Sequence, residues 1–384
     1  MKIGFDAKRA LNNSTGLGNH ARILLNALLR DFPEHEYLLF SPKAKEEYLE
    51  QLHGRFNIFF PETKFQKTLH PLWRSFGIKK QLTQNRIDIY HGLSNEIPFS
   101  IQHSTFSTVV TIHDLIFLKH TEQYPFVDRK IYELKTRYAA KHADKIIAVS
   151  NETKIDLVER YGVDEKKIAV IYPSVDTAFQ NAECARLNDE VGQGMRNAEI
   201  TAKYKLPAKY ILNVGSFFPR KNQRTLIEAF DLIKNKVEED LVLVGGVGTT
   251  RNEIEALIAQ KNLTQRVKII SGISNYELPA VYTAASAFVF PSLFEGFGAP
   301  VLEALFSKVP VIATRGGAIE EAGGKNTLYI SPTNAEEIAD ALLKVLTNET
   351  LRTQMQTSGY AHAQTMSDKV FAEKTMRVYE EVRR

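Results

Sequence analysis

The chain has 384 residues, of which 43% are hydrophobic and 24% charged, a composition typical of globular proteins and a length that suits two domains. Its net charge of +4 is too small to indicate nucleic-acid binding, although it is compatible with anionic ligands or an anionic membrane surface. The chain has a single cysteine, Cys184, which excludes an internal disulfide. We find neither a signal peptide nor a run of about 18 apolar residues. We therefore expect a cytoplasmic protein and leave open whether it contacts the inner face of a membrane.

Short β-branched or aromatic runs alternate with stretches of helical period along the whole chain. This alternation predicts an α/β fold with parallel sheets covered by helices. In the first half the predicted strands lie at 2–5, 36–40, 56–60, 88–91, 107–114, 145–150 and 167–172. In the second half they lie at 210–215, 240–245, 267–271, 287–292, 309–314 and 327–331.

The alternation pauses at 173–203, a polar stretch without a strand pattern. We therefore predict two doubly wound, Rossmann-like domains that face each other across a cleft, with ligands at the carboxyl ends of the strands. The predicted parts are an N-terminal domain over 1–175, a linker over 176–205, a C-terminal domain over 206–366 and a terminal helix over 367–384 that packs back toward the N-terminal domain.

The first motif, Gly16-x-Gly18-x-x-Ala21, has the outline of a dinucleotide-binding fingerprint. That fingerprint requires a tight turn directly after the first strand, which should end near Asp6. It also requires an acidic residue after the second strand, where Ser41 stands instead. We therefore interpret the motif as a glycine loop before a helix N-terminus, which suits an anion, or as a plain glycine-rich turn.

The most informative stretch is "FVFPSLFEGFGAPVLEAL" at 288–305, in which a buried strand leads through a glycine loop into a helix near Pro300. Glu295 on the loop and Glu303 on the helix have a Glu-x7-Glu spacing that lets both face one pocket. Carboxylates accept paired hydrogen bonds from sugar hydroxyls, and the N–H groups at the helix start suit an anion. For Glu303 alone, the alternative is a residue favoured by the helix dipole.

A second stretch, "LNVGSFFPRKNQRTLIEAF" at 212–230, places two cations after a strand that ends at Gly215. Arg220 and Lys221 stand just before a helix that starts near Asn222, where the helix dipole disfavours positive charge. They suit a phosphate or diphosphate, which arginine binds as a fork and lysine as a point charge. The alternative is a solvated pair.

Two further places provide candidates at the ends of strands. "VVTIHDLIF" at 109–117 ends an apolar strand with His113 and Asp114, where the alternative is a histidine satisfied in the core. Ile273 and Ser274 lie in the turn between a strand and a helix, at an edge expected to face the cleft.

The glycine loop, "TIHDL", "VGSFFPRKN" and "FPSLFEGFGAPVLEA" occur in the order found in one enzyme family. Together they resemble a retaining nucleotide-sugar glycosyltransferase of the GT-B fold, family 4, in its mannosyltransferase-like branch. The resemblance covers nearly the whole chain and implies a hexosyltransferase, with GDP-mannose as our first choice of donor. "VIYPSVD" at 170–176 departs from the family's usual Pro-Asn-Gly-Val-Asp turn, which leaves the behaviour of the hinge between the domains open.

The resemblance also implies roles for individual residues. Glu303 would bind the ribose hydroxyls of the donor, and Glu295 the hydroxyls of its sugar. Arg220 and Lys221 would neutralise the diphosphate, and His113 would sit on the reacting face of the sugar. The remaining donor contacts would come from backbone atoms at Gly16, Gly18, Gly215, Ile273, Ser274, Phe297, Gly298 and Ala299.

We expect no cofactor and no metal ion, because the chain has no Asp-x-Asp motif and the family needs no metal. The expected partners are a nucleoside-diphosphate sugar and a saccharide or lipid-linked acceptor, not a nucleic acid. The segment 65–80 mixes aromatic and basic residues, so it is either a solvated amphipathic helix or a contact with a lipid or membrane. A nucleotide-sugar epimerase of the same fold and a nucleotide-sugar binder without turnover remain the alternative functions.

Overall fold

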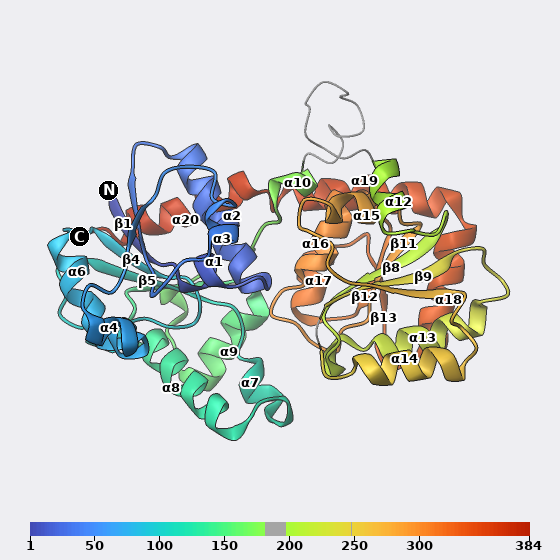
Figure 1. The fold of residues 1–384 in the computed structure, drawn as a ribbon, viewed down its shortest axis with the longest axis horizontal. Coiled ribbons are helices and arrows are strands. Elements are labelled where there is room, and N and C mark those ends of the chain that lie inside the picture. The colour runs from blue at the N-terminus through green and yellow to red at the C-terminus, as the bar shows by residue number, and fades with distance from the viewer. Residues whose placement is uncertain (181–196, 247) are drawn as a thin grey trace. The chain divides into compact units, whose positions relative to one another are not determined.

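The thirteen strands that the sequence predicts are all present in the computed structural model, which describes residues 1–180, 197–246 and 248–384. They form a seven-stranded sheet in the order β3-β2-β1-β4-β5-β6-β7 and a six-stranded sheet in the order β10-β9-β8-β11-β12-β13, with parallel pairing throughout (Figure 1). The strands are β1 (Lys2–Asp6), β2 (Glu36–Phe40), β3 (Asn57–Phe59), β4 (Ile89–Gly92), β5 (Ser107–Ile112), β6 (Lys145–Ala148), β7 (Ile168–Val170), β8 (Tyr210–Val214), β9 (Asp240–Val244), β10 (Val267–Ile270), β11 (Ala287–Phe290), β12 (Val311–Thr314) and β13 (Leu328–Ile330).

Each sheet belongs to one compact unit, and its helices connect successive parallel strands. The first unit comprises Met1–Ser174 with Asp368–Arg384, and the second comprises Val175–Ser367. The first contains α1 (Lys8–Asn12), α2 (Gly16–Asp31), α3 (Glu46–Leu49), α4 (Lys64–Thr68), α5 (His70–Leu72), the π-helix η1 (Trp73–Gly77), α6 (Ile78–Gln84), α7 (Ile116–Lys119), α8 (Phe126–His142), α9 (Asn151–Tyr161) and α20 (Asp368–Val382). The second contains α10 (Thr177–Gln180), α12 (Asn197–Lys203), the 3₁₀ turn η5 (Pro219–Lys221), α13 (Gln223–Ile233), α14 (Arg251–Gln260), α15 (Leu278–Thr283), α16 (Ala299–Phe306), α17 (Gly317–Gly323), α18 (Ala335–Thr347) and α19 (Glu349–Gln364).

The strand order of both sheets reverses at one point. In the first sheet the reversal lies between β1 and β4, and in the second between β8 and β11. Loops that leave neighbouring strands in opposite directions open a crevice at the carboxyl ends of those strands, where ligands of doubly wound sheets bind. The two reversal points therefore fix where each unit can bind a ligand.

Buried apolar strands form the centre of each sheet, as parallel sheets covered on both faces require. Ile3 and Phe5 of β1 are fully buried with Leu24 and Leu28 of α2. In the second unit, Ile211 of β8 and Leu226 and Phe230 of α13 share a core. The helical faces seen in the sequence are thus the faces that cover the sheets.

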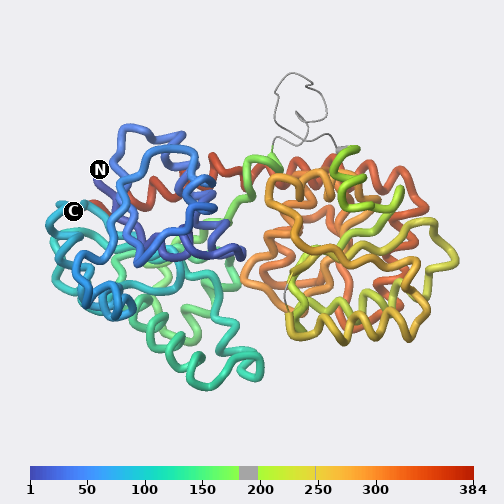
Figure 2. The backbone as a smooth tube through the Cα atoms, in the orientation of Figure 1, coloured from blue at the N-terminus to red at the C-terminus, as the bar shows by residue number. Residues whose placement is uncertain are grey.

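The terminal helix α20 packs in the first unit, beside α2, although it follows the whole second unit in the sequence (Figures 1 and 2). The Tyr379 hydroxyl lies 2.6 Å from Nδ1 of the buried His91, and Arg30 of α2 pairs with Asp368. Part of the predicted linker, 181–196, lies outside the described residues. The described remainder of 176–205 contains the helices α10 and α12 and no strand.

The sequence did not predict α1, which occupies five of the nine residues between β1 and Gly16. Together with Ser41 after β2, this helix rules out the compact strand–turn–helix that a dinucleotide fingerprint needs. The interpretation of Gly16-x-Gly18 as something other than a dinucleotide loop therefore agrees with the structure.

We expect Tyr379→Phe to destabilise the first unit, because it leaves a nitrogen of the buried His91 without its partner while preserving the aromatic ring. The loss should be about 1–3 kcal/mol in the free energy of unfolding. Chemical denaturation followed by circular dichroism measures it, with Tyr276→Phe at an exposed site as the control. An unchanged unfolding midpoint would show that the hydrogen bond contributes nothing to holding α20.

Candidate active site

The second unit brings two cations and one carboxylate together at its reversal point. Arg220 Nη1 lies 2.6 Å and Lys221 Nζ 2.5 Å from the same oxygen, Oε1 of Glu295. The cations follow β8 and the glutamate follows β11, which are neighbours in the sheet. The structure therefore brings these three predicted residues together.

Local backbone geometry holds the two cations in place. They lie in η5, and Asn222 then adopts a left-handed conformation, with φ of 56°, that turns the chain into α13. The Asn222 amide donates to the carbonyls of Pro291 and Pro332, and the Leu293 N–H donates to the Arg220 carbonyl. The loops after β8 and β11 are thereby joined by hydrogen bonds on both sides of the cations.

The charges of the cluster depend on one another. Burial lowers the pKa of Lys221, while the nearby Glu295 carboxylate opposes that shift. Burial would raise the pKa of Glu295, but the Lys221 ammonium and the Arg220 guanidinium outweigh it and hold that pKa below its ordinary value. Glu295 is consequently ionised at neutral pH and occupies the position on the cations that an anionic ligand would share.

Glu303 lies in a different environment on α16. Tyr282 donates a hydrogen bond of 2.7 Å to Glu303 Oε2. Burial raises the pKa of Glu303 to about 7, and the charge of Asp176 adds to the rise, whereas the Tyr282 hydroxyl and Lys221 oppose it. Near neutral pH this carboxyl group can therefore be either neutral or ionised.

The glycine loop between the two glutamates ends in a helix N-terminus. Gly298 has a φ of 110°, which favours glycine, and α16 begins at Ala299 with Pro300 in its first turn. The first N–H groups of a helix have no partner within it, so the start of α16 is suited to an oxygen ligand. Phe297 is buried beneath this turn.

The other predicted donor-binding residues also follow strands of the second sheet, at the carboxyl ends of those strands. Gly215 directly follows β8, and the aliphatic part of Lys221 lies close beside it. Ile273 and Ser274 follow β10, the edge strand, and Ser274 bonds to Glu277 through its N–H and its hydroxyl. Within the described residues, no hydrogen bond or ion pair joins Ile273 or Ser274 to the Arg220–Lys221–Glu295 cluster.

Gly16, Gly18 and His113 are the predicted residues that belong to the first unit. Gly16 and Gly18 form the first turn of α2, so the loop before this helix is shorter than expected. A side chain at Gly18 would come within 1.9 Å of the Asn13 carbonyl oxygen, which explains the glycine. Arg22 holds the preceding turn by donating to the carbonyls of Ala10 and Asn13.

His113 follows β5 and is fixed by two contacts with the loop after β4. The ring nitrogen Nε2 of His113 lies 2.9 Å from the Leu93 carbonyl oxygen. The backbone N–H of His113 donates to Asn95 Oδ1. Burial lowers the pKa of His113 to about 4, so the imidazole is neutral at neutral pH. If Nε2 carries the proton given to Leu93, Nδ1 is left as an acceptor.

Sequence reasoning missed His20 and Tyr282. His20 lies edge-on to His113 with ring centroids 4.6 Å apart, and both of its buried ring nitrogens lack a hydrogen-bond partner among the described residues. Its spacing from Leu24 and Leu28 on the buried face of α2 was a usable signal. Tyr282 is 21 residues from Glu303, and no local pattern connects the two.

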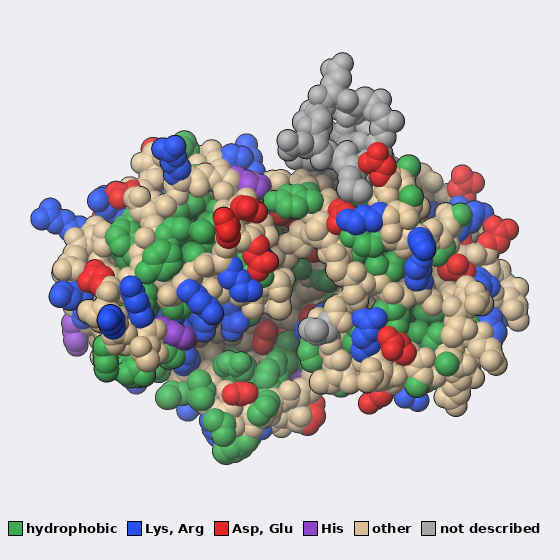
Figure 3. All heavy atoms as spheres, in the orientation of Figure 1, with side chains coloured by type: hydrophobic (Ala, Val, Ile, Leu, Met, Phe, Trp, Pro, Cys, Tyr) green, Lys and Arg blue, Asp and Glu red, His purple; other side chains and the backbone are tan. Residues whose placement is uncertain are grey.

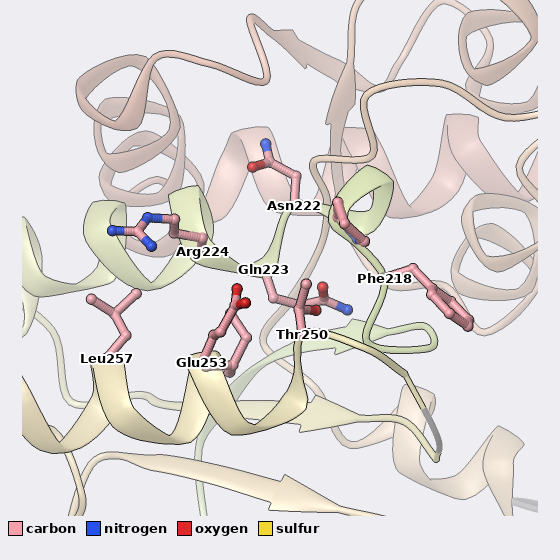
Figure 4. Close-up of a pocket in the computed structure, with 9 residues that line it drawn as sticks. Phe218, Asn222, Gln223, Arg224, Thr250, Glu253 and Leu257 are labelled. Carbon is pink, nitrogen blue, oxygen red and sulfur yellow. The ribbon is translucent and has the colours of Figure 1, made fainter. Parts of the chain in front are cut away.

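A pocket of about 200 Å³ lies beside the cation loop but is lined by neither cation. Figure 4 shows Gln223 and Arg224 at the start of α13 opposite Thr250 and Glu253 of α14. Glu295 and Glu303 do not line it either, so we do not assign the donor to this pocket.

Two family models match the chain: Glycosyltransferase Family 4 over 14–179 and Glycosyl transferases group 1 over 197–362. The chain is 24% identical over 400 residues to O-antigen chain mannosyltransferase B of Escherichia coli, covering 99% of both proteins. It is 26% identical over 291 residues to the serotype-specific mannosyltransferase WbdA of Escherichia coli, covering 74% of this chain and 34% of WbdA. The solved structure of Anabaena HepE in complex with UDP-glucose shares the fold with a TM-score of 0.76, at 16% identity and covering 99% of this chain and 100% of HepE.

We expect Glu295→Ala to lower the stability of the second unit by about 1–3 kcal/mol, because it leaves Lys221 and Arg220 without their shared partner. Inorganic phosphate should raise the melting temperature of this variant more than that of the wild type, since the anion can replace the carboxylate. Asp231→Ala is the matched control, because Asp231 also pairs with two cations, Lys234 and Lys261, at a more exposed site. An equal phosphate response in both variants would contradict the expectation.

Proposed function

The chain belongs to glycosyltransferase family 4 of the GT-B fold, and we propose that it transfers mannose from GDP-mannose to a saccharide or lipid-linked saccharide with retention of the anomeric configuration. Its activity as a hexosyltransferase follows from the family and its mannosyltransferase relatives. The donor, the acceptor class and the stereochemistry are the proposal. The observation that carries it is the Arg220–Lys221–Glu295 cluster at the reversal point of the second sheet.

The cluster suits the leaving group of such a transfer. When the bond between the anomeric carbon and the diphosphate oxygen breaks, negative charge develops on the diphosphate and positive charge on the sugar ring. We propose that Arg220, Lys221 and the N–H groups at the start of α16 stabilise the diphosphate, because fixed charges and dipoles need no reorganisation during the reaction. Glu295 would then accept hydrogen bonds from the sugar hydroxyls.

Glu303 is proposed to hold the nucleotide rather than to react. An ionised carboxylate can accept hydrogen bonds from both hydroxyls of a ribose. Lys221 lies close enough to influence the charge on Glu303, so the ribose and diphosphate positions would be adjacent. Two carboxylates with different protonation behaviour thus receive different roles, and neither is assigned as the acid or nucleophile of a glycosidase.

The first unit is proposed to supply the acceptor side. A neutral His113, fixed by Leu93 and Asn95, can accept a hydrogen bond from a hydroxyl of the sugar. We propose that the acceptor hydroxyl attacks the anomeric carbon from the face that the diphosphate leaves and gives its proton to a diphosphate oxygen. We also propose that no divalent metal takes part, since the two cations can neutralise the diphosphate.

Mannose is preferred because the two curated relatives reported above are named mannosyltransferases. Among structural neighbours, HepE was solved with UDP-glucose at 16% identity, which bears on the fold rather than on the donor. One of these relatives is named for the O-antigen chain, so we propose polysaccharide biosynthesis as the process in which this chain acts.

A thermal-shift panel of GDP, UDP, ADP and their sugar conjugates tests the donor, with EDTA present in one arm. Binding raises the melting temperature by mass action, so the preferred nucleotide should give the largest shift. The shift should be lost in Glu303→Ala and Lys221→Ala and kept in Lys234→Ala, which changes a partly exposed lysine elsewhere in the same unit. A larger shift with a uridine conjugate, or a shift abolished by EDTA, would overturn the corresponding part of the proposal.

Product analysis separates the alternative functions. A transferase releases the nucleoside diphosphate only as sugar is transferred to an acceptor or to water, and nuclear magnetic resonance of the product reports its anomeric configuration. An epimerase would convert the donor sugar without an acceptor, and a binder would release no diphosphate. Either of these results would replace the transferase assignment.

The affinity for the preferred nucleotide sugar should increase about tenfold between pH 6 and pH 8, because a group with a pKa of about 7 goes from about one tenth to about nine tenths ionised over that range. His113 stays neutral there, and the diphosphate diester of the donor does not titrate. Isothermal titration calorimetry at both pH values measures the change. Glu303→Gln should remove the pH dependence, and Tyr282→Phe should move it to higher pH; a Glu303→Gln variant that keeps the dependence would contradict the assignment.

A further inference from the structure

An amphipathic segment of the first unit turns its apolar face to solvent. Phe65, Leu69, Leu72 and Phe76 follow one another at intervals of four, three and four residues along the consecutive short helices α4, α5 and η1, the spacing of an amphipathic helix. All four are exposed, whereas Trp73 on the opposite side is buried. The segment therefore presents to solvent the kind of residues that helices normally bury.

Helix α8 repeats the same arrangement. Val127, Ile131, Leu134 and Tyr138 have the same four, three and four spacing, and the first three are exposed. Phe126, at the start of the helix, is also exposed. Two separate helical segments of one unit thus have outward apolar faces of similar length.

The two faces meet at Phe99. The rings of Phe76 and Phe99 stack with centroids 5.6 Å apart, and Phe99 meets Tyr138 edge-on at 4.7 Å. Beneath this contact, Glu96 pairs with Arg74 of η1 and with Lys135 of α8. The exposed residues therefore belong to one continuous surface, which we call the α4–α8 face.

Basic residues outnumber acidic ones in the segments that form the α4–α8 face. Residues 60–80 contain five Lys or Arg and one Glu, and residues 126–142 contain five Lys or Arg and two acidic residues, while the whole chain has 49 basic and 45 acidic residues. Lys64, Lys67, Lys80, Lys130, Arg137 and Lys141 are exposed. Figure 3 shows hydrophobic side chains along the lower edge of the part that contains α4 and α8, with Lys and Arg side chains beside them.

We propose that the α4–α8 face docks the first unit onto a bilayer that contains anionic lipid. Apolar side chains accompanied by basic residues are typical of a segment that binds at a membrane interface. The apolar face of such a segment enters the headgroup boundary, and its cations contact lipid phosphates. The cations select this occupant over a second copy of the chain, because two copies of a basic face repel each other. No helix among the described residues is long and apolar enough to cross a membrane.

The position of the face bears on the acceptor, and this step rests on the proposed function. Arg74, whose neighbours in sequence lie on the face, also donates to Asp6 at the carboxyl end of β1, next to the reversal point of the first sheet. A lipid-linked acceptor held in the bilayer would thus be presented close to the ligand-binding edge of the unit proposed to supply the acceptor side.

Flotation with phosphatidylcholine vesicles, with and without an equal part of phosphatidylglycerol, tests the docking. The wild-type chain should bind the anionic vesicles, and salt should weaken the binding. Phe65→Ser with Leu72→Ser, and separately Val127→Ser with Leu134→Ser, should each lower the partition coefficient by about tenfold or more. Lys64→Gln with Lys67→Gln should lower it about fivefold per charge.

The matched control is Ile155→Ser with Leu232→Ser, since these side chains, 53% and 52% exposed, are as exposed as Leu72 at 50% but lie off the face. This control should bind vesicles like the wild type. No nucleotide or acceptor is added, so a failure of the proposed transfer leaves the assay unaffected, and thermal unfolding followed by circular dichroism shows that the same variants are folded. The proposal would be overturned if the wild-type chain did not bind vesicles or if all variants bound them equally. It would also be overturned if sedimentation velocity showed a dimer that the Ser variants dissociate.

Discussion

The arrangement of charges in the second unit depends on one carboxylate oxygen shared by two cations. Arg220 and Lys221 would repel each other at this distance, and Lys221 is nearly buried, so the arrangement requires Glu295 between them. The sheet makes this possible because β8 and β11 are neighbours, although 72 residues separate the end of one from the start of the other. The cluster proposed to bind the diphosphate is therefore fixed by the fold itself, and fixed charges stabilise a leaving group most effectively.

The same stretch of chain holds a second carboxylate in the opposite electrostatic state. Glu295 faces two cations and stays ionised, whereas Glu303, eight residues later, faces a phenol and the charge of Asp176. The glycine loop and the start of α16 separate the two environments. Divergent pKa values of neighbouring groups commonly distinguish their functions, which agrees with the different roles proposed for these two carboxylates.

The sequence predicted the strands well because each is a short apolar run bounded by polar or glycine residues. The sequence also singled out Arg220 and Lys221 and the pair Glu295 and Glu303. Adjacent cations before a helix, and two carboxylates beside a glycine loop, are unfavourable without a ligand or a partner. Helix α1 was missed because five residues give too little periodicity to recognise. The contacts of Tyr282 with Glu303 and of His20 with His113 join residues far apart in sequence, so only the packing of the helices on the sheets brings them together.

The outward apolar face of α8 needs a physical reason, because burial of apolar area stabilises by about 25 cal/mol per Å² and favours turning such a face inward. Two polar contacts of the helix prevent that rotation. Lys135 pairs with the buried carboxylate of Glu96, and the Tyr138 hydroxyl donates to the Phe99 carbonyl at 2.6 Å. Rotating α8 would leave Glu96 with Arg74 alone and break both contacts, so the exposed face is held by interactions that reach the ligand-binding edge of the first sheet.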